Sequence, residues 1–113
     1  GSTSRDFCFV ANAVQANLKA ATTQVPGATD AVYNVAVGGK TSLLELYRFI
    51  RDRLSKQRPA LAALEPTFQP FRPGDIKDSQ ADISRAKEKL GYAPTHTVAQ
   101  GLDETVTYVM GAH

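Results

Sequence analysis

The sequence predicts a small α/β fold with two or three short strands and about four helices. Two runs rich in apolar and aromatic residues, 5–10 and 31–37, have the composition of strands. Each run is followed by a stretch in which apolar residues recur every three or four positions, as they do along one face of a helix. The 113 residues amount to one small domain with a modest core.

The first strand leads directly into a helix predicted over residues 11–23. Its apolar positions are spaced by three and four, and they are Ala11, Val14, Leu18 and Ala21. Pro26 and Gly27 interrupt the pattern, because proline and glycine favour a turn.

The second strand, 31–37, is followed by a tight turn at Gly38 and Gly39 and then by a second helix. Ser42 is placed to cap that helix, and Glu45 three residues later completes a capping box. The apolar stripe of the helix consists of Leu43, Leu46, Tyr47, Ile50 and Leu54.

Residues 57–75 contain four prolines and are expected to be irregular. Within this stretch, residues 67–71 could form a short edge strand, where proline is tolerated. Asp82 is the expected cap of a third helix over 83–90, which ends at Gly91. Thr97 and Gln100 form a second candidate capping box, which opens a last helix over 98–110.

Composition and charge exclude several classes of protein. The net charge of +2 is too small to indicate binding to nucleic acid or to a membrane surface. Cys8 is the single cysteine, so it has no disulfide partner within the chain, and with only two histidines it cannot form a Cys/His metal site. No run of 18 apolar residues and no signal peptide is visible, so we expect a cytoplasmic protein without a transmembrane helix.

Two segments carry residues suited to binding chemistry. Arg5 precedes Asp6 at the first strand, and Arg72 precedes Asp75 in the irregular stretch before Ser79. An arginine fork suits bidentate recognition of phosphate. The alternative interpretation is that each arginine forms an exposed ion pair of little energetic value.

Four motifs, in this order, resemble those of the extended short-chain dehydrogenase/reductase family, which includes nucleotide-sugar 4-epimerases. They are Arg5-Asp6-Phe7-x-Phe9-Val10, Tyr33-Asn34-Val35 before the glycine turn, Arg72-x-Gly74-Asp75 followed by Ala81-Asp82-x-Ser84-x-Ala86, and Leu90-Gly91-Tyr92-Ala93-Pro94 before the last helix. The resemblance covers nearly the whole chain. It implies that residues 1–113 correspond to the C-terminal, nucleotide-sugar-binding region of an extended Rossmann-type epimerase.

The resemblance also implies roles for four residues. Arg5 and Arg72 would contact the diphosphate of a UDP-sugar, and Asp75 would bind the ribose hydroxyls. Ser79 would lie near the C2 substituent of the sugar, where its small side chain leaves room for an N-acetyl group. The similarity of residues 11–17 is greatest to the branch that acts on UDP-N-acetylglucosamine and UDP-N-acetylgalactosamine.

The parts of such an enzyme that perform catalysis are not found in this sequence. It contains no G-x-G-x-x-G and no tyrosine followed four residues later by lysine. In the family, NAD takes hydride from C4 of the sugar and returns it. We therefore expect no catalytic residues, no cofactor site and no metal site here, and no activity from this chain alone.

A second hypothesis is that the chain acts by itself as a self-associating binding or assembly module with a vestigial sugar site. The two strands and the helix faces beginning at Val14 and Leu43 are apolar, and 113 residues cannot cover all of them. Unpaired strand edges add to this tendency. We therefore expect a homodimer.

Overall fold

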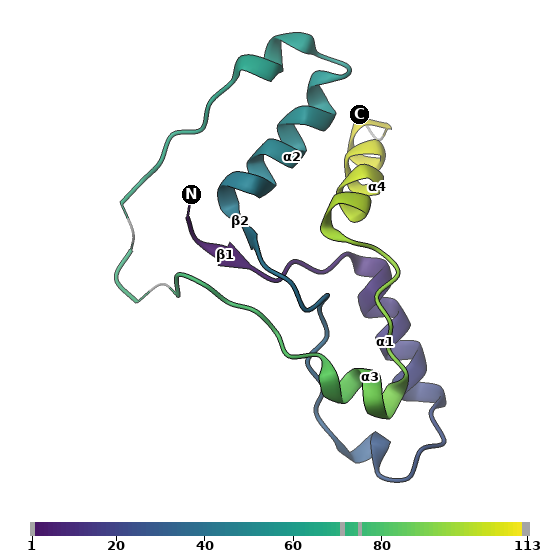
Figure 1. Ribbon diagram of the computed structural model, residues 1–113. Helices are drawn as coiled ribbons and strands as arrows, with labels where there is room; N and C mark the ends of the chain where they lie inside the picture. The colour runs from purple at the N-terminus through teal and green to yellow at the C-terminus, as the bar shows by residue number, and fades with distance from the viewer. Residues whose placement is uncertain (1, 71, 75, 112–113) are drawn as a thin grey trace.

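A two-stranded antiparallel sheet joins the beginning of the chain to the start of its second long helix. The computed structural model describes residues 2–70, 72–74 and 76–111. Among these it contains four α-helices and one small sheet, which confirms the predicted fold class (Figure 1). In chain order the elements are β1 (Ser4–Arg5), α1 (Val10–Thr22), η1 (Ala28–Asp30), β2 (Thr41–Ser42), α2 (Leu43–Ser55), η2 (Pro59–Ala63), α3 (Ser84–Leu90) and α4 (Val98–Gly111).

The first strand is shorter than predicted. In the β1–β2 ladder Ser4 lies opposite Ser42 and Arg5 opposite Thr41, and the ladder ends there. On its other side Ser4 forms a parallel bridge with Asp78. The prediction of a strand over residues 5–10 is therefore wrong beyond Arg5, because residues 6–9 have no ladder partner and α1 begins at Val10.

The prediction of a strand over residues 31–37 is wrong. This segment pairs with no other described segment, and a run of β-prone residues becomes a strand only beside a partner backbone. Side chains hold it instead: the Tyr33 hydroxyl donates to the carbonyl oxygen of Ala28 at 2.6 Å, and the Tyr92 hydroxyl donates to that of Ala36 at 2.6 Å. Residues 67–70 likewise form no strand, and Phe71 lies outside the described residues.

The two predicted capping boxes are confirmed. At the start of α2 the Glu45 amide donates to Ser42 Oγ at 3.0 Å, and the Ser42 amide donates to Glu45 Oε1 at 3.4 Å. At α4 the Gln100 amide donates to Thr97 Oγ1 at 3.2 Å, and the Thr97 amide to Gln100 Oε1 at 2.9 Å. These bonds satisfy amides that a helix leaves unpaired at its first turn, which explains where both helices begin.

The third helix begins one residue later than predicted, at Ser84. Asp82 Oδ1 accepts hydrogen bonds from the Ser84 amide at 3.0 Å and from Ser84 Oγ at 2.6 Å, so Asp82 fixes the entry to α3 from one position further back. The helix ends as predicted at Gly91, whose φ of 68° is left-handed and favours glycine.

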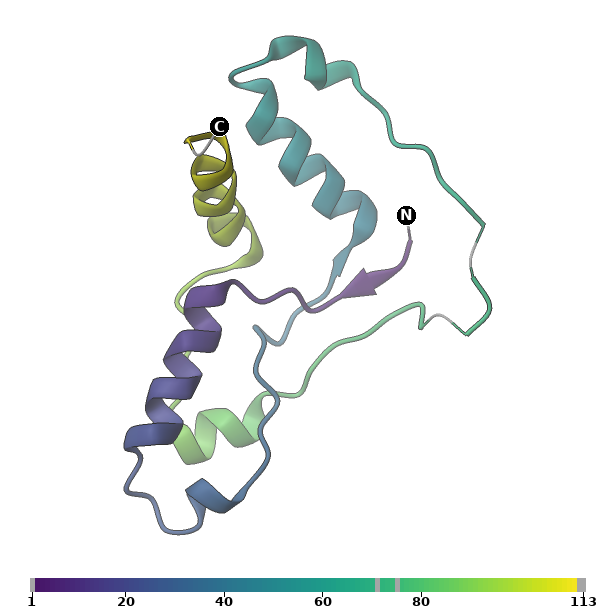
Figure 2. The same ribbon diagram turned by 180° about the vertical axis from the view of Figure 1, so that it is seen from behind.

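The helices form two groups on either side of the sheet (Figures 1 and 2). One group packs α1 against α3 and η1, and the other packs α2 against η2 and α4. The buried core lies in the first group and is small; it consists of Ala16, Ala36, Ile83, Ala86 and Tyr92.

The face of α1 that is buried differs from the apolar stripe read from the sequence. Asn12 and Ala16 are its buried residues. Of the predicted stripe, Val14 and Leu18 are instead 49% and 62% exposed, and Val10 at the start of the helix is 65% exposed. Asn12 is buried because its side chain holds the 95–96 segment: it donates to the His96 carbonyl at 2.9 Å and accepts from the Thr95 amide at 2.8 Å.

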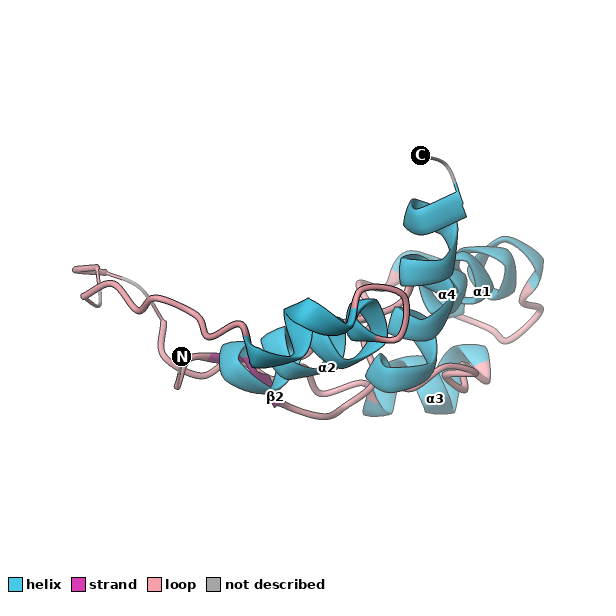
Figure 3. Cartoon of the chain, turned by 90° about the horizontal axis from the view of Figure 1, so that it is seen from above, coloured by secondary structure: helices cyan, strands magenta, loops and turns pink. Residues whose placement is uncertain are grey.

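The molecule is flat and extended. Its dimensions are 55 × 37 × 19 Å and its radius of gyration is 17.1 Å (Figure 3). A compact chain of this length would have a radius of gyration of about 13 Å. Much apolar side-chain surface, including the stripe on α1, therefore remains in contact with solvent.

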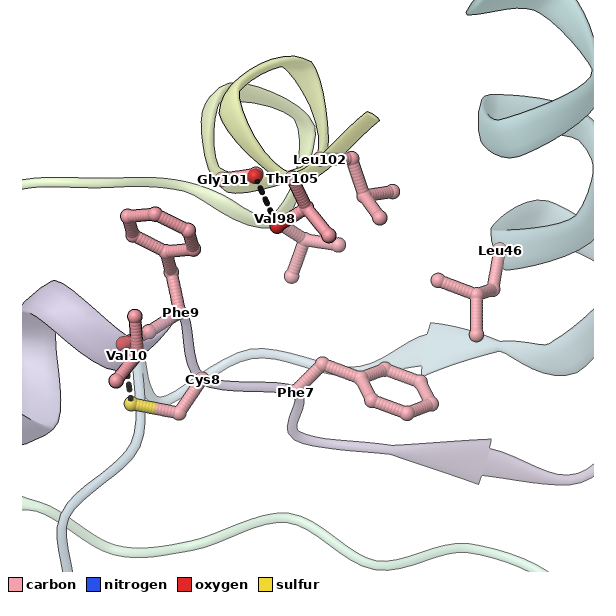
Figure 4. A pocket seen from close by; sticks show the side chains of 9 residues that line it. All are labelled: Phe7, Cys8, Phe9, Val10, Leu46, Val98, Gly101, Leu102 and Thr105. Carbon is pink, nitrogen blue, oxygen red and sulfur yellow. Dashed lines mark hydrogen bonds between the residues drawn. The ribbon is translucent and has the colours of Figure 1, made fainter. Parts of the chain in front are cut away.

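The last helix docks through a glycine. Gly101 is buried in α4, and a Cβ atom built on it would lie 2.7 Å from Phe9 Cβ and 2.8 Å from Phe9 Cγ. Figure 4 shows the Phe9 ring beneath this turn of the helix, beside Val98. Only a residue without a side chain lets the helix approach Phe9 so closely.

Replacing Gly101 by alanine should therefore destabilise the fold by about 1–3 kcal/mol, because the added methyl group forces Phe9 or α4 to move. Gly111, in the same helix, is the matched control, since a Cβ there meets no atom within 4 Å. Gly111→Ala should be neutral or stabilising by up to about 1 kcal/mol. Denaturant unfolding of both variants measures the difference, and equal stabilities would contradict the close contact.

Candidate functional site

A pocket lies where β1 ends, between three segments that are far apart in the sequence. Its volume is about 610 Å³. Arg5 and Asp6 form one wall, residues 34–36 a second and residues 79–82 a third. Two of the four predicted site residues, Arg5 and Ser79, therefore line the same pocket.

Arg5 is partly buried and anchored to backbone oxygens. Its Nη1 donates to the Ser4 carbonyl at 2.7 Å and to the Lys77 carbonyl at 3.3 Å. The guanidinium thus lies across the junction of β1 with the 77–79 segment. A guanidinium carries five N–H donors, so these contacts orient it and leave capacity for an anion.

Ser79 is positioned by the backbone of β1. Its amide donates to the Ser4 carbonyl at 3.1 Å, next to the bridge between Ser4 and Asp78. Ser4 Oγ also donates to Asp78 Oδ1 at 2.6 Å, and this bond lowers the pKa of the Asp78 carboxyl. Ser79 therefore directly follows the bridge residue Asp78, and its amide is held to β1.

Asp6 connects the walls of the pocket. Its Oδ1 accepts from the Val37 amide at 3.1 Å, and its Oδ2 accepts from the amides of Gly38 at 2.9 Å and Ala81 at 3.3 Å. The sequence motif contained this residue next to Arg5, but sequence reasoning gave it no separate role. The available signal was a carboxylate inside a segment predicted to be an apolar strand.

Two further side-chain bonds cross between the second and third walls. Gln80 Nε2 donates to the Gly38 carbonyl, and Asn34 Nδ2 donates to the Asp82 carbonyl at 3.4 Å. Asp82 itself accepts from the side chain and the amide of Ser84, and these bonds lower the pKa of its carboxyl. Both carboxylates of the pocket, Asp6 and Asp82, are therefore hydrogen-bonded to the protein.

Tyr92 supports the pocket from behind. It is buried, and its hydroxyl bonds the Ala36 carbonyl, which belongs to the second wall. Burial, followed by the nearby Cys8 and the charge of Asp6, raises the pKa of Tyr92 to about 12. The phenol therefore remains a neutral donor through the physiological range of pH.

The other two predicted residues are not part of this pocket. Arg72 is exposed and lines a separate cleft of about 750 Å³ between the start of α2 and the loop after η2. Asp75 lies outside the described residues. The pocket at Arg5 thus has one guanidinium and two carboxylates, and a diphosphate there would need a second cation.

A third cavity, of about 230 Å³, is chemically different (Figure 4). It lies between residues 7–10, Leu46 of α2 and one face of α4. Its polar groups are the Cys8 thiol, which is partly exposed rather than fully buried, and Thr105 Oγ1, which donates to the Gly101 carbonyl at 2.8 Å. Such an apolar lining is unsuited to a phosphate.

Two further features concern the part of the chain that the structure describes. None of its helices combines the length and the hydropathy that crossing a bilayer requires. Within the same residues, no three His, Cys, Asp or Glu side chains are grouped so that they could hold a metal ion.

Comparison with known proteins identifies the type of fold to which the pocket belongs. A family model described as GDP-mannose 4,6-dehydratase matches residues 1–105. A UDP-glucose 4-epimerase of Mycolicibacterium smegmatis is 35% identical over 108 residues, which are 96% of this chain and 32% of that protein.

Solved structures give the same result. The UDP-glucose 4-epimerase of Thermotoga maritima, solved with UDP-glucose, is 30% identical with a TM-score of 0.83 over 99% of this chain and 33% of that one. The UDP-N-acetylglucosamine 4-epimerase of Methanobrevibacter ruminantium, solved with UDP-N-acetylmuramic acid, is 31% identical with a TM-score of 0.82, over 100% of this chain and 33% of that one. The chain spans about a third of the length of these relatives.

Proposed function

The chain belongs to the GDP-mannose 4,6-dehydratase family, and we propose that it forms the nucleotide-sugar-binding part of a UDP-sugar 4-epimerase. The relatives to which it is similar include UDP-sugar 4-epimerases of the short-chain dehydrogenase/reductase type. Its proposed ligand is the UDP part of a UDP-N-acetylhexosamine. The observation that carries the proposal is the meeting of Arg5 and Ser79 in one pocket of a chain that superimposes along its whole length on epimerase structures.

The chemistry of the pocket supports an anionic, hydroxyl-rich ligand. Arg5 is already oriented by two carbonyl oxygens, so binding a phosphate costs it little side-chain entropy. Amide, hydroxyl and carboxylate groups from Asn34, Ser79 and Asp82 surround it. Because two carboxylates also lie there, the proposal requires Arg72 to move from its own cleft to the diphosphate when ligand binds.

The proposed role is binding and not catalysis. The sequence has neither the glycine-rich fingerprint of a dinucleotide site nor a Tyr-x-x-x-Lys pair, so its residues do not fit NAD by that route. The part of the reaction assigned to this chain is to hold the nucleotide and orient the sugar.

Arg5→Ala and Arg72→Ala should each lower the affinity for UDP, because each removes a charge-assisted contact worth about 1.5–3 kcal/mol. Calorimetric titration of the full chain with UDP measures this. Arg48→Ala, at an exposed position of α2 that lines neither pocket, is the charge-matched control and should bind as the unmutated chain does. An Arg72→Ala variant of undiminished affinity would leave Arg72 as a surface charge only.

The finer proposal, that the sugar carries an N-acetyl group at C2, depends on the small side chain of Ser79. Ser79→Tyr should fill the space beside Arg5 and weaken binding of UDP-N-acetylglucosamine more than that of UDP-glucose. The two affinities, measured on each variant, give a ratio that is insensitive to general loss of folding. A ratio unchanged by the substitution would contradict this role for Ser79.

A second candidate function is self-association as a binding or assembly module. The observation that favours it is the exposed stripe of Val10, Val14 and Leu18 on α1 of a flat molecule. Apolar residues spaced by four along a helix form a continuous surface that an identical helix could cover.

If this surface mediates dimer formation, light scattering at micromolar concentration should give about twice the chain mass of 12.2 kDa. Val14→Glu should restore the monomer, because it buries a charge in the interface. Gln57→Glu, exposed in the turn after α2, adds the same charge elsewhere and should leave the dimer intact. A monomer in the unmutated protein, with unfolding independent of concentration, would exclude this function.

A further inference from the structure

The pocket is held together by one side chain that does not itself need to touch a ligand. Asp6 follows Arg5 at the end of β1, and its two oxygens accept three backbone amides. Val37 and Gly38 lie 31 and 32 residues away in sequence, and Ala81 lies 75 residues away. One carboxylate therefore joins the three segments that form the walls.

Among the described residues no main-chain ladder joins the second wall to β1, whereas the third wall also has the backbone bonds of Ser4 to Lys77 and Ser79. The 31–37 segment pairs with no strand, so its distance from Arg5 depends on side chains. Two of the amides that Asp6 binds, those of Val37 and Gly38, come just after residues 34–36 of the second wall. The third, that of Ala81, lies within residues 79–82 of the third wall. A shift of either segment would change the position of Asn34 or Asp82 relative to the Arg5 guanidinium.

The charge of Asp6 points to a structural reason for its presence. A carboxylate beside a phosphate-binding arginine repels the phosphate, so as an isolated charge it would weaken binding. The same carboxylate offsets this weakening by holding the walls of the pocket in place. It can do so because charge-assisted bonds to N–H groups are stronger than neutral ones.

We propose that Asp6 is the positioning residue of the nucleotide-sugar pocket: it holds the Val37–Gly38 turn and the Ala81 amide against the end of β1, and so sets the positions of Asn34 and Asp82 relative to Arg5. The identity of the ligand in this inference rests on the proposed function. The role of Asp6 in fixing the three segments rests on the bonds described above.

The test compares Asp6→Asn and Asp6→Glu with Asn12→Ala in the full chain. Asn12→Ala also removes side-chain bonds to backbone groups, but those groups belong to Thr95 and His96, which do not line the pocket. Asp6→Asn removes the charge and one acceptor, whereas Asp6→Glu keeps the charge but moves it by one methylene group and guards against a failure of Asp6→Asn to fold.

All three variants should lower the melting temperature, but only the Asp6 variants should weaken UDP binding, by about tenfold or more, in calorimetry below that temperature. If Asp6 acted only by repelling the phosphate, Asp6→Asn would instead raise the affinity for UDP. Affinity equal to or tighter than that of the unmutated chain in both Asp6 variants overturns the proposal.

Amide hydrogen exchange without ligand separates this inference from the proposed function. Asp6→Asn should accelerate exchange at Val37, Gly38 and Ala81 together, whereas Asn12→Ala should not affect these three amides. If the unmutated chain binds no UDP, the proposed function fails, and the exchange pattern alone decides the role of Asp6. Unchanged exchange at the three amides would overturn it.

Discussion

The Asp6 carboxylate, with its bonds to the amides of Val37, Gly38 and Ala81, is the interaction on which the arrangement of the other parts depends. The sheet contributes two residue pairs and a single bridge, which fix only the surroundings of Ser4. Beyond that point the chain relies on side chains that bind backbone groups. Asp6 holds the glycine turn, Tyr92 holds Ala36, and Asn12 holds residues 95 and 96.

This mode of construction suits a binding pocket built from loops. Asn34 and Ser79 lie outside the strands, so their side chains can share one space with Arg5 at the end of β1. The cost is that the geometry depends on a few polar bonds, each modest in net energy. A small buried core of alanines, Ile83 and Tyr92 supports these bonds from one side only.

The apolar surface left exposed has the same origin. A flat molecule with a radius of gyration of 17.1 Å cannot bury both faces of its helices, and α1 uses its Asn12 and Ala16 face for the internal contacts. Val10, Val14 and Leu18 then remain on the outside. The chain spans about a third of its relatives' length. Under the first proposed function this apolar surface is available to a further domain of an epimerase, and under the second it is available to a second copy of the chain.

The sequence by itself determined the features whose physical cause lies within a few residues. The boxes at Ser42 and Thr97, the stop at Gly91, the four helices and the family motifs are all local, because caps, left-handed glycines and helical spacing act over one turn of chain. Only the tertiary structure decided that residues 31–37 have no strand partner, that α1 buries its Asn12 face, and that Arg5 meets Ser79 while Arg72 lines another cleft. Those outcomes depend on contacts between segments tens of residues apart, and neither β-propensity nor apolar spacing specifies which backbone or side chain a segment will meet.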